Sequence, residues 1–379
     1  MNTPPQLSRR SFGKIMGVTA AYVALQPTSA RFIAQASPTI DKSDLTVVRL
    51  SANENPYGPS QVALKAMSDA FSLAWRYPDE HEDALIESIR KLNNVSSDQV
   101  LLGNGSGEIL RLAAAAFTDL NRPLVMADPT FEAIAHHAQV AGAKVVKVSL
   151  AATYAHDLPK MAQAARNGGL IYVCNPNNPT ASITAKDQVR AFLAKVPSNT
   201  IVLIDEAYHH YVESDAYEST IPLIEQYPNL IVARTFSKIY GMAGLRCGYA
   251  AAQPALIRTM RTRRTMDSVN IMALVAANVS LGDVAHVTEG RSRNSVVKKL
   301  VCGELDKSGF TYIPSHANFM MIDLRREVRP VISALRQRGV EVGRVFPALP
   351  NLLRVTIGTQ PQMETFIKEF RVVMSSGSA

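Results

Sequence analysis

Thr235-Phe236-Ser237-Lys238 places two hydroxyls and a lysine ahead of a glycine-rich stretch that ends in Gly244-Leu245-Arg246. The hydroxyls, the lysine and the arginine lie within twelve residues of sequence, in an otherwise apolar setting. A buried lysine is costly unless it is paired or used, and burial lowers the pKa of its amine. This pattern predicts a nucleophilic amine at Lys238, close to groups that bind an anion.

A carboxylate and a glycine-rich turn follow two other apolar runs. Asp205 comes directly after the run 201–204 and precedes Glu206-Ala207-Tyr208, although a lone acid in such a place is often a helix N-cap. The turn from Gly103 to Gly107 opens a helix, whose free amides and dipole would hold a phosphate. Many strand–helix turns contain glycine, so neither feature is specific by itself.

The three features are specific in combination. A phosphate needs helix-end amides, hydroxyls and an arginine. A pyridine nitrogen needs a carboxylate to stay protonated, and an aldehyde needs an amine with a lowered pKa. Because the chain offers all of these groups, the sequence predicts an enzyme that carries pyridoxal 5'-phosphate.

Alternating helical and strand patterns predict an α/β fold with a mainly parallel sheet that positions these groups. Amphipathic helices are expected at 61–72 and 82–92. Short apolar runs, typical of strands buried on both faces, occur at residues 100–102, 124–127, 144–148, 170–173, 201–204 and 230–233. Because open α/β sheets bind ligands at the carboxyl ends of their strands, we expect the chemical groups to meet at that edge.

The pattern changes after about residue 281, where a long basic helix is expected at 284–300. Strands at 311–313, 319–322 and 353–357, with a helix at 331–338, predict a smaller α+β domain. A chain of 379 residues is also long for one core. We therefore expect four parts, which are a targeting segment 1–36, an arm 37–60, a large cofactor-binding domain 61–280 and a small C-terminal domain 281–379.

The first residues resemble a twin-arginine export signal. Arg9-Arg10 is followed by Phe12 and Lys14, then by a weakly apolar stretch at 15–25 and a small-residue cleavage site at Ala34-Gln35-Ala36. Such a signal implies the twin-arginine export machinery as a partner and a periplasmic location, reached after the cofactor is loaded in the cytoplasm. The alternative is a basic helical arm on a cytoplasmic protein.

Charge and cysteine content argue against nucleic-acid and metal sites. Half of the formal net charge of +8 comes from the first 36 residues, so the remainder is only mildly basic. The dense run Arg258, Arg261, Arg263 and Arg264 is expected to be a solvated helix face, and no nucleic-acid partner is expected. The three cysteines are far apart and no CxxC or histidine-rich spacing occurs, so no metal is expected.

Seven motifs together resemble the fold-type I, class I/II aminotransferases, and most of all their histidinol-phosphate aminotransferase branch. The resemblance runs from about residue 45 to the C-terminus. The motifs are Asn53-Glu54-Asn55-Pro56-Tyr57-Gly58-Pro59, Arg76-Tyr77-Pro78-Asp79, Gly103-Asn104-Gly105-Ser106-Gly107-Glu108, Asn175-Pro176-Asn177-Asn178-Pro179-Thr180, Asp205-Glu206-Ala207-Tyr208, Ser237-Lys238 with Gly244-Leu245-Arg246, and Leu353-Arg354-Val355-Thr356-Ile357-Gly358. The resemblance implies a seven-stranded, mainly parallel sheet between helices in the large domain.

The resemblance also implies roles for the cofactor-binding residues. Lys238 would form the Schiff base and shuttle the substrate proton, Asp205 would pair with the pyridine nitrogen, and Tyr208 and Asn175 would donate to the phenolic oxygen. Phe131 would stack on the ring unless it is plain core, and Tyr57 would reach the cofactor phosphate of a neighbouring subunit, which implies a homodimer with shared active sites. The phosphate cup would consist of Ser106, Gly107, Thr235, Ser237 and Arg246.

On the substrate side, Arg354 would grip the carboxylate, with Asn175 beside it, unless Arg354 forms a surface ion pair. Arg344 would either supply a second positive charge or lie at the rim. Two positions depart from the family pattern, because Ala181 replaces the usual glycine and Gly107 the usual aspartate. With the export signal, these departures weaken the assignment to histidinol phosphate.

We therefore expect a ping-pong aminotransferase that moves an amino group between an amino acid, aromatic or large and apolar, and a 2-oxo acid. Histidinol-phosphate transamination is an alternative. A lyase, cyclase or oxidase reaction on the same scaffold is another, because the motifs serve the cofactor and not the reaction outcome. A binding protein that kept the pocket would not need Lys238, Asp205 and Tyr208 together.

Overall fold

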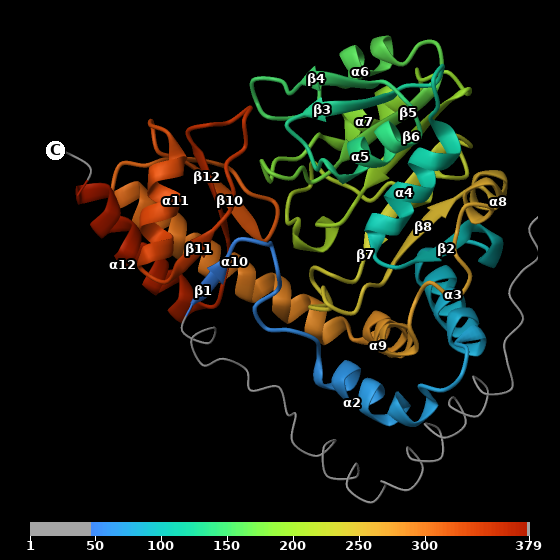
Figure 1. The fold of residues 1–379 in the computed structure, drawn as a ribbon, viewed down its shortest axis with the longest axis horizontal. Helices are drawn as coiled ribbons and strands as arrows, with labels where there is room; N and C mark the ends of the chain where they lie inside the picture. Colours follow the sequence, from blue (N-terminus) through green and yellow to red (C-terminus); the bar gives the residue numbers. More distant parts are fainter. Residues whose placement is uncertain (1–46, 377–379) are drawn as a thin grey trace, which may run out of the picture. The chain divides into compact units, whose positions relative to one another are not determined.

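Seven strands form the larger sheet of the computed structural model, which describes residues 47–376 (Figure 1). In spatial order they are β2 (Val100–Gly103), β8 (Gly248–Ala252), β7 (Leu230–Thr235), β6 (Thr200–Asp205), β5 (Gly169–Cys174), β3 (Leu124–Asp128) and β4 (Val145–Ser149). β8 is antiparallel to both of its neighbours, so the other six strands run in one direction. The expected mainly parallel sheet is confirmed.

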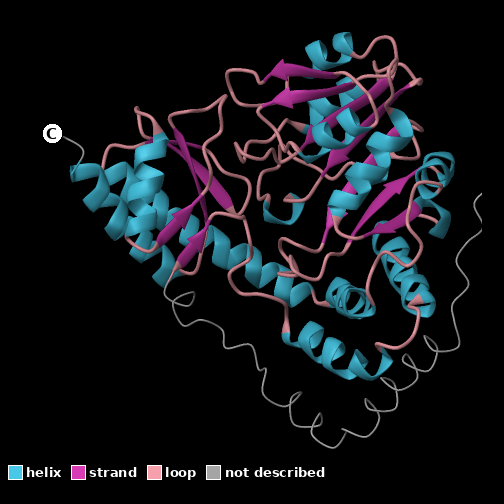
Figure 2. Cartoon of the chain, viewed as in Figure 1, coloured by secondary structure: helices cyan, strands magenta, loops and turns pink. Residues whose placement is uncertain are grey.

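Helices cover both faces of this sheet (Figure 2). One hydrophobic cluster joins the sheet to α4 (Ser106–Phe117), α5 (Ala133–Val140) and α8 (Pro254–Arg261). A second cluster on the other face takes residues from α2 (Gln61–Ala70), α3 (Asp79–Asn93), α6 (Leu158–Ala164), α7 (Lys186–Leu193) and α9 (Ile271–Gly282). Because successive side chains of a strand point to opposite faces, Leu101 belongs to the first cluster and Leu102 to the second.

The C-terminal part has its own sheets and core. β9 (Thr311–Ile313), β10 (Phe319–Asp323) and β12 (Leu352–Thr356) form an antiparallel sheet, and β1 (Val48–Leu50) pairs in parallel with β11 (Val340–Val342). They pack with α10 (Val284–Lys307), α11 (Val328–Gln337) and α12 (Gln360–Ser376) around one hydrophobic cluster. The expected arm therefore contributes β1 to this part of the fold.

Side-chain caps fix where several helices begin. The side chains of Ser60, Asn270 and Asp283 accept hydrogen bonds from the third backbone N–H of α2, α9 and α10 respectively. Such caps stabilise a helix by about 0.5–2 kcal/mol. The N-cap residue of α4 is Gly105, which has no side chain to accept a hydrogen bond. Its φ of +73° is a conformation that favours glycine.

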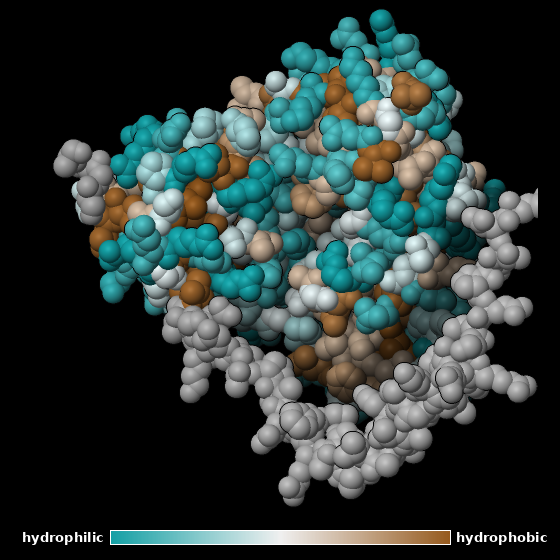
Figure 3. All heavy atoms as spheres, in the orientation of Figure 1, coloured by the Kyte–Doolittle hydropathy of each residue, from teal (hydrophilic) through white to brown (hydrophobic). Residues whose placement is uncertain are grey.

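The face formed by α2 and α9 carries an exposed hydrophobic patch (Figure 3). Val62, Phe71 and Val279 are exposed there, and Trp75 follows close behind in the chain. Within residues 47–376 no single helix is long and apolar enough to cross a membrane; only the bent pair α9–α10 meets those criteria, by length and composition alone. The predicted export signal at 1–36 and residues 37–46 of the predicted arm lie outside the described residues.

Candidate active site

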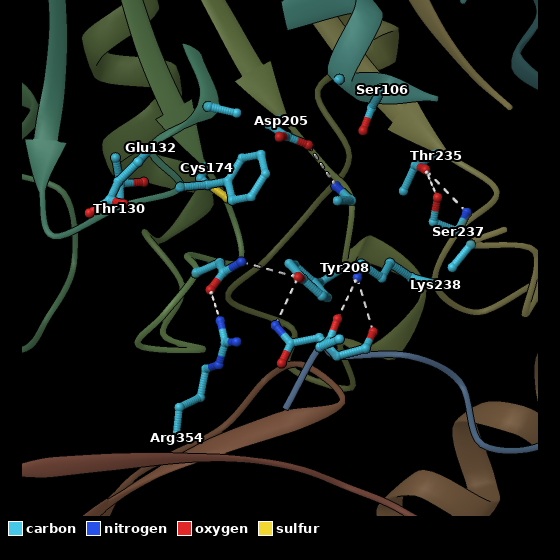
Figure 4. Close-up of a pocket in the computed structure, with 18 of the residues that line it drawn as sticks. Ser106, Thr130, Glu132, Cys174, Asp205, Tyr208, Thr235, Ser237, Lys238 and Arg354 are labelled. Atoms are coloured by element: carbon cyan, nitrogen blue, oxygen red, sulfur yellow. Dashed lines mark hydrogen bonds between the residues drawn. The ribbon is translucent and has the colours of Figure 1, made fainter. Parts of the chain in front are cut away.

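A cavity of about 590 Å³ lies where the carboxyl ends of β3, β5, β6 and β7 meet the N-terminus of α4 and the strand β12. Figure 4 shows Asp205, Thr235, Ser237 and Lys238 on the side of the larger sheet, with Arg354 extending toward them from β12. Eleven of the thirteen predicted site residues line it: Ser106, Gly107, Phe131, Asp205, Tyr208, Thr235, Ser237, Lys238, Arg246, Arg344 and Arg354. Tyr57 and Asn175 are not among its lining residues.

Lys238 follows β7 and extends into the cavity. Its Nζ donates to the carbonyl of Asn53 at 3.0 Å and lies 5.5 Å from the centre of the Tyr208 ring. Burial and then the nearby charge of Arg354 lower the pKa of Lys238 to about 8. A substantial fraction of the side chain is therefore neutral near pH 8, as an amine that attacks an aldehyde must be.

Asp205 ends β6 at the floor of the cavity and is 3% exposed. Its carboxylate accepts from Tyr172 Oη at 2.9 Å and from the amide of Ala207 at 3.1 Å. Burial raises the pKa of Asp205 to about 6, although both hydrogen bonds act in the opposite direction. A buried carboxylate that is partly protonated near neutral pH is well suited to pair with a cationic ring nitrogen, which would hold it ionised.

Tyr208 is surrounded by two asparagines, and neither of them is the predicted one. Its hydroxyl accepts from Asn53 Nδ2 at 3.1 Å and from Asn178 Nδ2 at 3.3 Å. Asn175 was expected here, but its side-chain amide forms two hydrogen bonds with the backbone of Thr184, at 2.9 and 3.0 Å. The structure thus brings Asn178 to the cavity and to Tyr208 in place of Asn175, and the role predicted for Asn175 stays a prediction.

The residues of the predicted phosphate cup line one cavity, and their binding of a phosphate stays a prediction. Thr235 Oγ1 donates to Ser237 Oγ at 3.0 Å, and Arg246 Nη1 donates to the same Ser237 oxygen at 3.4 Å. A Cβ at position 105 would lie only 2.3 Å from Arg246 Nη2, so the glycine makes room for the guanidinium beside the start of α4. Arg246 itself has φ +62°, a conformation that costs a non-glycine residue about 1–3 kcal/mol and is often kept at functional sites.

Arg354 comes from the small sheet and stands at the substrate side. Its Nη1 donates to Asn178 Oδ1 at 2.8 Å and its Nη2 to the carbonyl of Ser51 at 2.7 Å. Burial and the nearby Arg344 lower the pKa of Arg354. Its buried Nε has no hydrogen-bond partner in the described part of the chain. Arg354 is therefore a partly buried cation that keeps N–H donors for a ligand.

Three other predicted features take defined places. Phe131 lines the cavity and is 39% exposed, so it is not plain core. Tyr57 lies against Arg293, whose guanidinium carbon is 4.7 Å from the ring centre; its role in a neighbouring subunit stays a prediction. Ala181, at the family's glycine position, has φ +58°, which explains why glycine is usual there.

Several functional residues were missed. Asn178 and Asn53 stand in quoted motifs, but the sequence does not show which asparagine of a motif faces the cavity. Glu132 directly follows the predicted Phe131 and lines the cavity, and Tyr172 supports Asp205 from the neighbouring strand β5. Register supplies the missing signal for Tyr172, because β5 and β6 pair Tyr172 with Leu203, two residues from Asp205.

Comparison with known proteins agrees with this geometry. Residues 46–370 match the family model "Aminotransferase class I and II". A histidinol-phosphate aminotransferase of Moorella thermoacetica is 39% identical over 87% of this chain and 86% of its own, and that of Bacillus subtilis strain 168 is 36% identical over 85% and 90%. The structure of histidinol-phosphate aminotransferase from Sinorhizobium meliloti in complex with pyridoxal-5'-phosphate superposes with a TM-score of 0.82 and 26% identity, covering 86% of this chain and 91% of that one.

The chain belongs to the class I and II aminotransferase family. It has the fold of the fold-type I aminotransferases and is a pyridoxal-phosphate-dependent enzyme that acts on amino acids and 2-oxo acids. The residues present fit this cofactor. Lys238 would hold its aldehyde, Asp205 its ring nitrogen, and the cup of hydroxyls with Arg246 its phosphate.

Proposed function

We propose that this aminotransferase takes its amino group from an aromatic or large apolar amino acid, with Arg354 binding the α-carboxylate. The supporting observation is the guanidinium of Arg354, which lines the cavity and uses one N–H of Nη1 and one of Nη2 for its bonds to Asn178 and Ser51. Buried donors are almost always hydrogen-bonded, so a ligand oxygen is the natural partner. A carboxylate matches the planar guanidinium and neutralises its charge.

The charges around Arg354 favour an anion with a single charge. Arg344, the other arginine on this side, already pairs with Glu132 at 2.6 Å. Arg354 then remains as the one uncompensated cation on the substrate side of the described cavity. Phe131 and Phe346 add aromatic surface beside it, which suits an apolar side chain.

Each residue then has a task in the reaction. When bound, the cofactor supplies an electron sink for the carbon that carries the amino group. Arg354 orients the substrate carboxylate, and Tyr208 with Asn178 and Asn53 forms a hydrogen-bonded group beside the ring. Lys238, whose pKa is lowered to about 8, takes the proton from the substrate carbon.

A panel of amino donors tests the proposal. Each donor is mixed with the holoenzyme in the absence of an acceptor, and the absorbance change of the bound cofactor gives the rate of the first half-reaction. We expect phenylalanine, tyrosine or leucine to react with the highest kcat/KM. The proposal fails if histidinol phosphate outcompetes every free amino acid.

Histidinol phosphate is the second candidate substrate, and two observations favour it. The relatives described above carry that name at 36–39% identity. Arg344 also lies near enough to Arg354 to lower the pKa of its guanidinium, so a phosphate could engage both arginines if Glu132 moved away. The same donor panel decides between the two substrates.

We also propose that the protein is exported by the twin-arginine route, on the basis of Arg9-Arg10 and the cleavage site that ends at Ala36. Replacing both arginines by lysine should leave unprocessed protein in the cytoplasm, while the unmodified chain loses its first 36 residues. Cell fractionation with marker enzymes and mass spectrometry of the mature N-terminus measure both effects. Full-length wild-type protein in the cytoplasmic fraction would show that the segment is only an arm.

A homodimer with shared active sites is the state we propose for the enzyme, as is typical of the family. The exposed patch on α2 and α9, with Phe71 and Trp75 beside it, supports an interface because monomers rarely expose large apolar patches. Sedimentation should give twice the chain mass. Phe71→Glu, which places a charge in the proposed interface, should lower the sedimenting mass toward that of the monomer. A wild-type monomer that binds the cofactor normally would contradict the proposal.

A further inference from the structure

Glu132 and Arg344 form an ion pair that joins the two sides of the cavity. Glu132 precedes α5, on the side of the larger sheet, and Arg344 lies between β11 and β12 of the C-terminal part. Their side chains meet at 2.6 Å, and both are about half exposed. Both residues line the cavity, so the pair stands where a substrate must pass or bind.

Arg344 and Arg354 share one aromatic ring. The guanidinium carbon of Arg344 lies 4.4 Å from the centre of Phe346, and that of Arg354 lies 5.1 Å from the same centre. Glu132 and Asp205 are the two acidic residues among those that line the described cavity, and Asp205 lies with Tyr172 at its floor. Glu132 is therefore the carboxylate that offsets the charge of Arg344, and Arg354 keeps its own charge.

We propose that Glu132 is a resident counter-ion of Arg344 and thereby determines which substrates the enzyme accepts. This inference rests on the proposed function, because it assigns the first substrate carboxylate to Arg354. An apolar amino acid leaves the Glu132–Arg344 pair intact. A substrate with a second anionic group, such as a dicarboxylic 2-oxo acid, displaces Glu132 and takes its place on Arg344.

The exposure of the pair makes this exchange feasible. An exposed ion pair contributes little stability, so a substrate anion can open it at small cost. A ping-pong enzyme binds its donor and its acceptor in the same site, one after the other. The Glu132–Arg344 pair lets one cavity accept an apolar donor and a dicarboxylic acceptor in turn.

Glu132→Gln tests the proposal, because it keeps the size of the side chain and removes its charge. Glutamate and glutamine are compared as donors, since they differ mainly in the distal charge. We expect the ratio of their kcat/KM values to rise about fivefold in favour of glutamate, near the upper end of what an exposed ion pair contributes. Arg344→Gln should lower the ratio below wild type, alone or combined with Glu132→Gln.

Glu218→Gln is the matched control. Glu218 also pairs with an arginine, Arg190, but neither residue lines the cavity. The control should leave the ratio unchanged. If Glu132→Gln also leaves it unchanged, or lowers kcat/KM equally for all donors, Glu132 is not a counter-ion that substrates displace, and the proposal is overturned.

A binding measurement separates this inference from the proposed function. Glutarate and its monoamide are titrated calorimetrically into the wild-type and Glu132→Gln holoenzymes, without turnover. Glutarate should bind about fivefold more tightly to the variant, whereas its monoamide should not gain. If free amino acids prove to be poor donors, the proposed function fails and this titration still decides the role of Glu132. An equal affinity of glutarate for both proteins overturns the inference.

Discussion

The two walls of the cavity hold their side chains in different ways. On the cofactor wall, Asp205, Thr235 and Ser237 are 3%, 6% and 8% exposed, and each is hydrogen-bonded at the end of a strand. At the substrate end, Glu132 and Arg344 come from connecting segments on opposite sides of the cavity, and both are about half exposed. The cofactor wall is thus built before any ligand arrives, whereas the substrate end can rearrange. Chemistry common to the family is fixed by the sheet, and substrate choice is left to the connections.

Loss of the amine on the cofactor wall should have the largest effect. Lys238→Ala should lower turnover by at least about 10³-fold, because covalent attachment and proton transfer are both lost. Borohydride reduction followed by mass spectrometry measures the covalent link directly. Lys298→Ala is the control, since burial also lowers the pKa of Lys298 but this lysine does not line the cavity. A reducible adduct that persists in Lys238→Ala would place the link on another lysine.

The substrate end should depend most on Arg354. Arg354→Ala should lower kcat/KM for amino acids about ten- to a hundredfold, because a charged hydrogen-bonded contact contributes about 1.5–3 kcal/mol. The absorbance of the bound cofactor should stay close to that of the wild type. Steady-state kinetics with one good donor checks the effect, and Arg344→Ala serves as comparison. Unchanged kinetics in Arg354→Ala would show that the carboxylate binds elsewhere.

Burial of Asp205 should cost stability when the cofactor is removed. The folded pKa of about 6 lies above the ordinary value of 3.8, so the folded state holds a proton that the unfolded state releases. The free energy of unfolding therefore falls as pH rises from about 4 to 6. At pH 7 the buried, ionised Asp205 lowers it by about 1–3 kcal/mol. Asp205→Asn should weaken cofactor binding yet make the apoprotein more stable at pH 7. Urea unfolding of both apoproteins at pH 4 and pH 7 measures the difference, and equal pH dependence would contradict the assignment.

Residues at strand ends could be predicted from the sequence, whereas contacts between connecting segments could not. Apolar runs predicted six of the seven strands of the larger sheet, but not β8, whose sequence Gly-Tyr-Ala-Ala-Ala has weak strand propensity and is held by its neighbours. Lys238 and Asp205 were predictable because Asp205 is the last residue of the buried strand β6 and Lys238 follows shortly after the buried strand β7. Glu132 and its bond to Arg344 were not, because a contact across 212 positions depends on how two connecting segments fold. The pairing of β1 with β11 is of the same long-range kind.

Asn175 and Asn178 stand in the same motif, and the sequence alone does not show which of them faces the cavity. Comparing their variants should give the smallest effects. Asn178 donates to Tyr208 and accepts from Arg354, so it connects the two walls of the cavity. Asn175 forms both of its side-chain bonds with Thr184. Asn178→Ala should therefore lower kcat/KM about tenfold, since about 1.4 kcal/mol is lost in the reaction and little in folding. Asn175→Ala should instead lower the free energy of unfolding by about 1–3 kcal/mol, because it leaves buried backbone groups unpaired.

Kinetics and urea unfolding of both holoenzymes separate the two roles. The pH dependence of the cofactor absorbance adds a readout that a purely structural change would not move. This pH dependence should shift in Asn178→Ala, because the variant lacks the amide that donates to the Tyr208 hydroxyl. It should stay at the wild-type position in Asn175→Ala. If Asn175→Ala shifts the absorbance and Asn178→Ala does not, the first asparagine of the motif faces the cofactor after all.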